Sequence, residues 1–212
     1  MSPEQLNLQL PPHVLERLEI LMQGRERVLL GIAGTPGSGK STLARLLAAA
    51  VGPAAVVVPM DGYHLANQEL ARLGRQARKG APDTFDVDGY RATLLRLKER
   101  LDDIVYVPHF AREIEEPIAN AIAVDREVRL VISEGNYLLV PEGPWARIAG
   151  LFDDRWYVAV NGTTRMTRLV ERHQRYGRGL AEARAWAETV DEPNARLIER
   201  YAGRADFALP WD

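Results

Sequence analysis

VLLGIAGTPGSGKSTLARLL, residues 28–47, is the most informative part of the chain. It begins with a short apolar run, continues with the pattern G-x-x-x-x-G-K-[ST], and ends in a sequence with helical periodicity. Glycines in such a loop let successive main-chain N–H groups turn inward, and the start of the following helix adds positive potential. The stretch therefore predicts a strand, a phosphate-binding loop (P-loop) and a helix.

Side chains of this loop have expected contacts with a bound nucleotide. Lys40 is expected to reach the β- and γ-phosphates, and the hydroxyl of Ser41 is expected to bind Mg²⁺. The residues expected to surround the nucleotide are Gly34, Thr35, Pro36, Gly37, Ser38, Gly39, Lys40, Ser41 and Thr42.

The rest of the chain alternates apolar runs with helical patterns. The runs are continuous, which is typical of strands buried on both faces of a parallel sheet, and they lie at 28–33, 54–59, 104–108, 128–133 and 156–160. Helices are predicted at about 12–23, 40–51, 89–101, 163–177 and 180–200, and an edge strand at 205–210. This order predicts an α/β protein, a three-layer α/β/α P-loop NTPase fold with a mostly parallel five-stranded sheet and a helical lid.

Two long segments, 60–88 and 109–127, show no periodicity. Segments of this length in a compact domain usually bind something or move. We expect one domain over residues 1–212, with the lid at about 165–190.

Composition excludes several classes of protein. A formal net charge of -2 over 212 residues argues against a nucleic-acid partner, and the absence of cysteine excludes disulfides and thiolate metal sites. The N-terminus lacks the basic start and apolar run of a signal peptide, and no stretch reaches the roughly 18 apolar residues of a membrane span. We expect a cytoplasmic chain without a membrane partner, and a homodimer stays open.

Absent motifs narrow the class of P-loop protein. The N-K-x-D motif of GTPases and the L-S-G-G-Q signature of transport ATPases do not occur. DVDG at 86–89 fits the D-x-x-G pattern of G proteins, but no predicted strand precedes it. These observations favour a small-molecule kinase over a switch or transport ATPase.

Two carboxylates follow predicted strands. Asp61 comes two residues after the run 54–59, and Glu134 directly follows 128–133. Because ligands of open α/β sheets lie beyond the carboxyl ends of the strands, both side chains should face the P-loop. Asp61 is predicted to orient an acceptor hydroxyl and take its proton, and Glu134 to assist Ser41 with Mg²⁺. Solvated strand ends would explain both residues without a function.

Arginines step along the predicted helix 163–177 at intervals that place them on one face: Arg165, Arg168, Arg172 and Arg175. They predict a lid that closes over the nucleotide, excludes water and brings Arg168 and Arg172 to the transferring phosphoryl group. A solvated helix face paired with neighbouring glutamates is the alternative.

The remaining aromatic residues carry weaker signals. The 4 histidines lack metal-ligand spacing, so no metal other than Mg²⁺ is expected. His109 and Phe110 are expected to line the acceptor site or to fill the core. Four tryptophans are expected to pack only: Trp145, Trp156, Trp186 and Trp211.

Several motifs together resemble a known family. GTPGSGKST, MDGYH, RKGAPDTFD, VYVPHFAREIEEP, VISEGNYLL and the arginine helix resemble the phosphoribulokinase/uridine kinase/bacterial pantothenate kinase superfamily. The resemblance covers about residues 25–210 and looks closest to the bacterial branch labelled "putative fructose transport system kinase".

This resemblance implies an ATP-dependent kinase with a P-loop kinase fold and Mg²⁺ as cofactor. Asp61 matches the catalytic base of the family, and Glu134 matches an acid associated with Mg²⁺. Residues expected at the acceptor are Asp61, Tyr63, His64, Asp86, His109, Arg112, Asn136 and Asn194.

The sequence therefore predicts transfer of the γ-phosphoryl group of ATP to a hydroxyl of a sugar or a similar polar metabolite. Two alternatives stay open. The acceptor is a nucleoside or pantothenate, or the chain is a regulatory P-loop ATPase that phosphorylates no metabolite.

Overall fold

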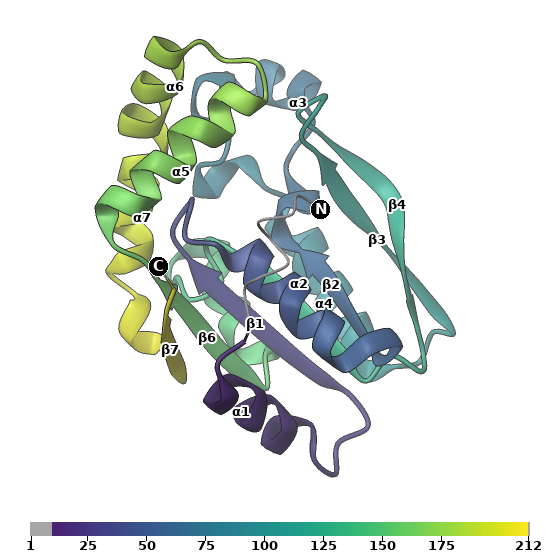
Figure 1. Cartoon of the computed structure of the whole chain (residues 1–212). Helices are drawn as coiled ribbons and strands as arrows, with labels where there is room; N and C mark the ends of the chain where they lie inside the picture. The colour runs from purple at the N-terminus through teal and green to yellow at the C-terminus, as the bar shows by residue number, and fades with distance from the viewer. Residues whose placement is uncertain (1–9, 212) are drawn as a thin grey trace.

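Five parallel strands form the central sheet of the computed structural model, which describes residues 10–211 (Figure 1). Their order is β2-β5-β1-β6-β7, and each neighbouring pair is parallel. The strands are β1 (Val28–Gly34), β2 (Ala55–Pro59), β5 (Leu130–Gly135), β6 (Asp154–Ala159) and β7 (Phe207–Pro210). The predicted α/β fold class, the mostly parallel sheet and the edge strand near 205–210 are confirmed.

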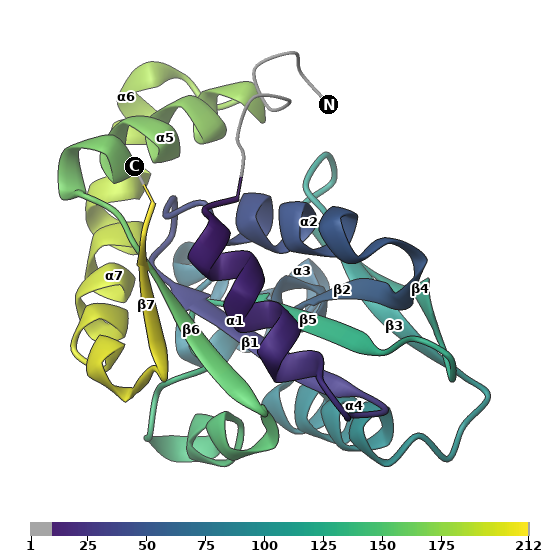
Figure 2. The same ribbon diagram turned by 60° about the horizontal axis from the view of Figure 1, so that its bottom comes forward.

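Helices cover both faces of this sheet (Figure 2). On one face, α1 (Pro12–Met22) and α2 (Lys40–Val51) bury apolar side chains against Leu30 and Ile32 of β1. On the other face, α4 (Val87–Glu99) and the segment 137–152 pack against Leu29. β1 and β5 are buried along their whole lengths, which agrees with their continuous apolar sequences.

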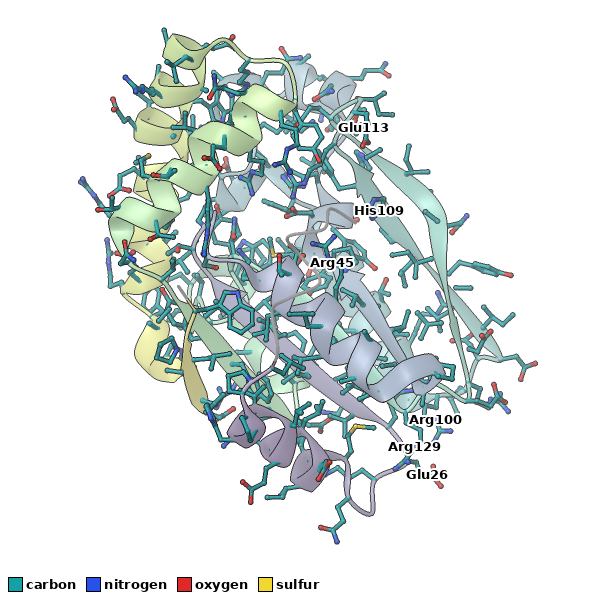
Figure 3. The ribbon with its side chains drawn as sticks, viewed as in Figure 1. Glu26, Arg45, Arg100, His109, Glu113 and Arg129 are labelled. Carbon is teal, nitrogen blue, oxygen red and sulfur yellow. The ribbon has the colours of Figure 1, made fainter. Side chains whose placement is uncertain are left out.

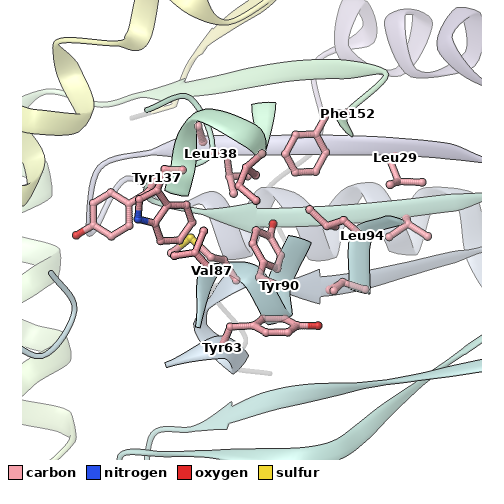
Figure 4. Packing of buried hydrophobic residues seen from close by; sticks show 14 of the residues in the cluster. Leu29, Tyr63, Val87, Tyr90, Leu94, Tyr137, Leu138 and Phe152 are labelled. Atoms are coloured by element: carbon pink, nitrogen blue, oxygen red, sulfur yellow. The ribbon is translucent and has the colours of Figure 1, made fainter. Parts of the chain in front are cut away.

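The core beneath α4 holds the ends of two strands in place (Figure 4). The buried hydroxyls of Tyr90 and Ser133 lie 2.6 Å apart, and Ser133 donates a 2.7 Å hydrogen bond to the main-chain oxygen of Val58. The register pairs Pro59 with Glu134. Asp61 and Glu134 therefore leave neighbouring strands at the same edge of the sheet.

One predicted strand lies outside the central sheet, contrary to the sequence prediction. The run 104–108 belongs to β3 (Ile104–Ala111), which pairs antiparallel with β4 (Glu116–Asp125) in a separate two-stranded sheet. Val105 and Val107 are buried, whereas Ile104 and Tyr106 are exposed. Only one face of β3 packs on the protein. Because the exposed residues on its other face are also apolar, the sequence has the continuous apolar pattern of a strand that is buried on both faces.

The two non-periodic segments contain secondary structure. Segment 109–127 supplies β4, and segment 60–88 contains α3 (Asn67–Arg72) and 3₁₀ turns. The 3₁₀ turns of the chain lie at 52–54, 60–63, 76–78, 82–84, 143–147, 149–151 and 202–204.

The predicted helix 180–200 is interrupted. It consists of α6 (Leu180–Trp186), a π-helical turn at 187–191 and α7 (Glu192–Glu199). Pro193 lies in the first turn of α7 and has no N–H to donate, so regular α-helical bonding stops before it. α5 (Gly162–Arg175) and α6 lie on one side of the P-loop, and the β3–β4 hairpin lies on the other (Figure 1). Within the described part of the chain, every helix is too short or too polar to cross a membrane.

Candidate active site

The loop between β1 and α2 has the backbone of an anion-binding nest. Gly37 and Gly39 have φ angles of 79° and 94°, which side chains other than that of glycine rarely allow. A Cβ atom on Gly39 would lie only 2.7 Å from Cδ1 of Trp211. The main-chain N–H groups at the start of α2 then follow this turn and favour a bound phosphate.

Lys40 lies buried at the start of α2. Its Nζ donates hydrogen bonds to the main-chain oxygen of Thr35 at 3.1 Å and to Oδ1 of Asn136 at 2.9 Å. Burial lowers the pKa of Lys40 to about 8, although Glu134 and Asp61 oppose the shift. A phosphate group would replace these neutral partners and restore a higher pKa.

Ser41 and Glu134 meet beside this lysine. Ser41 Oγ donates a 2.8 Å hydrogen bond to Oε1 of Glu134, which is buried. Burial raises the pKa of Glu134, and the charge of Lys40 opposes the rise. A hydroxyl beside a carboxylate is a donor set that Mg²⁺ accepts together with phosphate oxygens. These two residues therefore fit a Mg²⁺–nucleotide complex.

Asp61 lies in the turn after β2 and contacts the hairpin. Nη2 of Arg112 donates a 2.7 Å hydrogen bond to Oδ2 of Asp61. Burial alone would raise the pKa of Asp61, but Arg112, His64 and Lys40 outweigh it and hold the pKa below its ordinary value. Asp61 is therefore a carboxylate at neutral pH.

His64 is packed next to Asp61. Its Nδ1 lies 2.7 Å from the main-chain oxygen of Asp61, and its ring lies 4.0 Å from that of Phe85 and 4.6 Å from that of Phe110, between ring centroids. Burial lowers the pKa of His64, so the ring is neutral at pH 7 and donates Nδ1–H to that oxygen. It orients the turn that carries Asp61.

Two cavities meet at Asp61. The first, of about 320 Å³, extends from the P-loop to α6 and α7, and the second, of about 640 Å³, lies between α2, α5 and the hairpin. Arg45, His109 and Glu113 of the second cavity are labelled in Figure 3. Side chains that border both cavities are Lys40, Ser41, Asp61, Phe110, Arg112, Glu134, Arg172 and Tyr176.

The arginines of α5 separate into two groups. Arg172 borders both cavities, and Arg168 and Arg175 line the second. Arg168 Nη1 also donates a long, 3.4 Å hydrogen bond to the main-chain oxygen of Trp211. Arg165, in contrast, is buried away from both cavities and pairs with Glu192 of α7. Helical spacing alone did not separate the cavity arginines from this structural one.

The predicted acceptor residues also divide. His64, Asn136 and Asn194 line the first cavity, as do Asp61 and Arg112. His109 lines the second cavity rather than the first.

Two predicted acceptor residues line neither cavity. The ring of Tyr63 is buried in the core, 4.9 Å from the ring of Tyr90 between centroids (Figure 4). Asp86 is exposed and accepts a 2.8 Å hydrogen bond from the N–H of Gly89, which caps the start of α4. These contacts give both residues structural roles.

The first cavity contains residues that the sequence did not predict: Lys79, His173, Arg178, Trp186 and Asp191. Nε2 of His173 lies 2.7 Å from Oδ2 of Asp191. Trp186, expected only to pack, lies against the guanidinium of Arg178. Gly177 and Gly179, which flank Arg178, are compatible with either a hinge or a helix cap, and neither indicates what Arg178 contacts.

The sequence is similar to those of proteins named as kinases. The protein named "putative uridine kinase C227.14" of Schizosaccharomyces pombe is 35% identical to this chain over 89% of the chain and 85% of its own length. The chain belongs to the phosphoribulokinase/uridine kinase/bacterial pantothenate kinase superfamily of P-loop kinases. A superfamily member from Sorangium cellulosum, named pantothenate kinase, is 30% identical over 88% of this chain and 69% of its own.

A solved structure adds the branch within this superfamily. The crystal structure of a "putative fructose transport system kinase" from Silicibacter sp. TM1040 is 40% identical, covers 93% of this chain and 95% of its own, and has a TM-score of 0.82. This chain therefore belongs to the same branch as the Silicibacter protein, as the motifs of its own sequence predicted. No protein-family model matches the sequence.

Proposed function

We propose that this small-molecule kinase transfers the γ-phosphoryl group of ATP to a hydroxyl of a sugar or a similar polar metabolite. The observation that carries the proposal is the position of Asp61. Its carboxylate borders both the cavity that contains the glycines of the P-loop and the smaller cavity beneath α6 and α7. A group at this junction can reach an acceptor in one cavity and a nucleotide in the other.

Asp61 acts on the acceptor. As a carboxylate it accepts a hydrogen bond from the hydroxyl and holds the oxygen in line with the γ-phosphorus. Because Arg112 keeps its pKa low, Asp61 is a weak base and takes the proton late, after bonding to the leaving group has weakened. Orientation is its larger contribution.

Lys40 and Arg172 act on the phosphoryl group. Lys40 is buried and Arg172 is half-buried, and both lie at the junction of the two cavities, where a low dielectric strengthens their attraction for negative charge. Mg²⁺, with Ser41 as ligand and Glu134 nearby, neutralises phosphate charge when bound. Together these groups stabilise the negative charge on the equatorial oxygens during transfer.

Helices α5 and α6 serve as a lid in this proposal. Arg172 of α5 and Arg178, which lies between α5 and α6, line the first cavity together with Phe110 and Arg112 of the hairpin. Closure over the two substrates would exclude water, which otherwise competes with the acceptor for the phosphoryl group.

An acceptor screen tests the proposal. Release of ADP is followed with Mg²⁺-ATP and sugars, nucleosides or pantothenate in turn, and products are identified by mass. The expected result is ADP release that requires one class of metabolite and yields its phosphate ester. Slow hydrolysis of ATP that no metabolite accelerates would instead support a regulatory ATPase.

A further inference from the structure

Arg178 lines the first cavity and has no role in the proposed transfer step. Its guanidinium carbon lies 3.8 Å from the centroid of the Trp186 ring. Stacking on an aromatic ring uses the face of a guanidinium and leaves its edge N–H groups free to bind a planar or tetrahedral anion. The stack thus fixes Arg178 in an orientation suited to bidentate binding.

No close carboxylate of the described residues satisfies Arg178. Its nearest acid is Glu182, whose Oε1 lies 3.8 Å from Nε, beyond hydrogen-bond distance. The Glu182 side chain is 66% exposed, so water screens that pair. Nη1 of Arg178 is buried and has no hydrogen-bond partner among residues 10–211. A shielded, incompletely bonded guanidinium favours a bound anion.

Lys79 adds a second cation to the same cavity. Its Nζ donates to Oδ1 of Asn67 at 2.6 Å and to the main-chain oxygen of Glu115, and it lies 5.2 Å from the ring centroid of Phe110. An ammonium group has three donors, so one remains for a ligand. Both of its hydrogen-bond acceptors are uncharged, and Lys79 forms no ion pair within the described part of the chain.

The other charges of the cavity have partners. Asp61 is bound to Arg112, and Asp191 lies 2.7 Å from His173. Glu134 accepts from Ser41 and is attracted by Lys40. Glu115 also lines the cavity, but it is exposed to water. Once Lys40 and Arg172 hold the nucleotide phosphates, Arg178 and Lys79 remain as positive charges without a hydrogen-bonded carboxylate among the described residues, although Glu115 and Glu116 attract Lys79 from farther away.

We propose that the acceptor carries a carboxylate or phosphate group in addition to the hydroxyl that becomes phosphorylated, and that Arg178 binds this anionic group with help from Lys79. This inference rests on the proposed kinase function. The cavity volume of about 320 Å³ suits a small hydroxy acid, sugar acid or phosphorylated sugar. A neutral sugar would leave both cations without a hydrogen-bonded counter-charge.

Binding measurements test this without turnover. Calorimetry is done on the full chain with Mg²⁺ and a non-hydrolysable ATP analogue, using anionic probes and their neutral parents: glycerate and glycerol, gluconate and glucose, glucose 6-phosphate and glucose, pantothenate and pantothenyl alcohol. We expect at least one anionic probe to bind at least about tenfold more tightly than its parent. The inference is overturned if every neutral parent binds as well as its anionic partner.

Variants assign the effect to Arg178. Arg178→Gln is expected to lower the affinity for the preferred anionic probe by about 10–100-fold and to leave the affinity for its neutral parent and for the ATP analogue unchanged. Arg184→Gln removes an exposed arginine of α6 outside both cavities and is expected to change none of these affinities. Equal probe affinities in Arg178→Gln and the parent protein would overturn the inference.

Turnover separates this inference from the proposed function. Phosphorylation of neutral acceptors with kcat/KM equal to or above that of the anionic ones supports the kinase and overturns the anionic acceptor. Tight binding of an anionic probe that Arg178→Gln abolishes, without transfer to any probe, supports the anion site and contradicts the kinase. The carboxylate and phosphate probes show which of the two anions is preferred.

Discussion

Nη2 of Arg112 lies 2.7 Å from Oδ2 of Asp61, and this contact joins the β3–β4 hairpin to the end of β2. The two residues are far apart in the sequence: Arg112 lies in the turn between β3 and β4, and Asp61 lies in the 3₁₀ turn after β2. The turn of the hairpin therefore helps to keep Asp61, the residue that we propose binds the acceptor, ionised.

Arg112→Gln is expected to move the acidic limb of the pH–rate profile. Arg112 holds the pKa of Asp61 below its ordinary value, so its removal raises that pKa. Because the proposed mechanism requires the carboxylate form of Asp61, the loss of kcat/KM for the acceptor on acidification should begin at a higher pH in the variant. The profile is measured from pH 4 to pH 8, with Arg184→Gln as control. Superimposable acidic limbs would show that Arg112 does not tune Asp61.

The lowered pKa of Lys40 predicts a fall in kcat/KM for ATP at alkaline pH. Its pKa is lowered to about 8 mainly by burial, so the free enzyme loses this positive charge as the pH rises through that value. The kcat/KM for ATP should then fall about tenfold per pH unit above pH 8. In the complex, bound phosphates raise the pKa of Lys40, so kcat should stay level to a higher pH. A kcat/KM that stays level up to pH 10 would contradict this assignment.

Gly39→Ala tests the shape of the P-loop. The substitution requires a side chain at a φ of 94°, and its Cβ would lie 2.7 Å from Cδ1 of Trp211. We expect the affinity for ATP to fall by at least about tenfold, since a shift in this turn misaligns the main-chain donors. Gly150→Ala, at a site with nothing within 4 Å, is the matched control. Calorimetric titration with an ATP analogue distinguishes the two, and equal affinities would contradict the prediction.

Arg165→Met tests the attachment of α5 to α7. Arg165 is buried and pairs with Glu192, whose pKa is lowered first by that hydrogen bond. We expect a loss of about 1–3 kcal/mol in the free energy of unfolding, less than for a fully buried pair because Glu192 is partly exposed. The pKa of Glu192 is lower in the folded protein than in the unfolded chain, so its ion pair stabilises the fold at pH values above the unfolded pKa. The difference in the free energy of unfolding between the parent protein and Arg165→Met should therefore shrink as the pH falls below about 4.

Urea unfolding at pH 7 and pH 3.5 measures this difference. Arg196→Gln is the control, because Arg196 also contacts Glu192 but its side chain is 74% exposed. A control variant that loses as much stability as Arg165→Met would assign the effect to Glu192 generally rather than to the buried arginine.

The sequence alone predicted the P-loop and the positions of the two acids that follow strands. The glycine pattern of residues 34–41 and the strand before it require one turn, and the two strand-end acids follow from the geometry of parallel sheets. The β3–β4 hairpin was misplaced, because Ile104 and Tyr106 are apolar but exposed. Periodicity does not reveal whether an apolar side chain is covered.

The residues of the first cavity, on the acceptor side of the site, could not all be predicted from the sequence. Lys79 belongs to the motif RKGAPDTFD, but the motif does not indicate what Lys79 contacts. Arg178 follows the arginine helix, and only the tertiary fold brings the two residues to one cavity. Tyr63 illustrates the converse, since it adjoins Asp61 and His64 in sequence yet its ring packs in the core. Neighbours in a turn point in different directions, which the sequence alone does not specify.

The turnover of Asp61→Asn tests the central claim most directly. Asparagine keeps the size of the side chain but removes the negative charge that pairs with Arg112 and that we propose accepts the hydroxyl proton. We expect a folded protein that still binds ATP and whose kcat with the best acceptor falls by about 10²–10⁴-fold. A purified Asp61→Asn protein that retains the parent kcat would remove Asp61 from the mechanism and contradict the account.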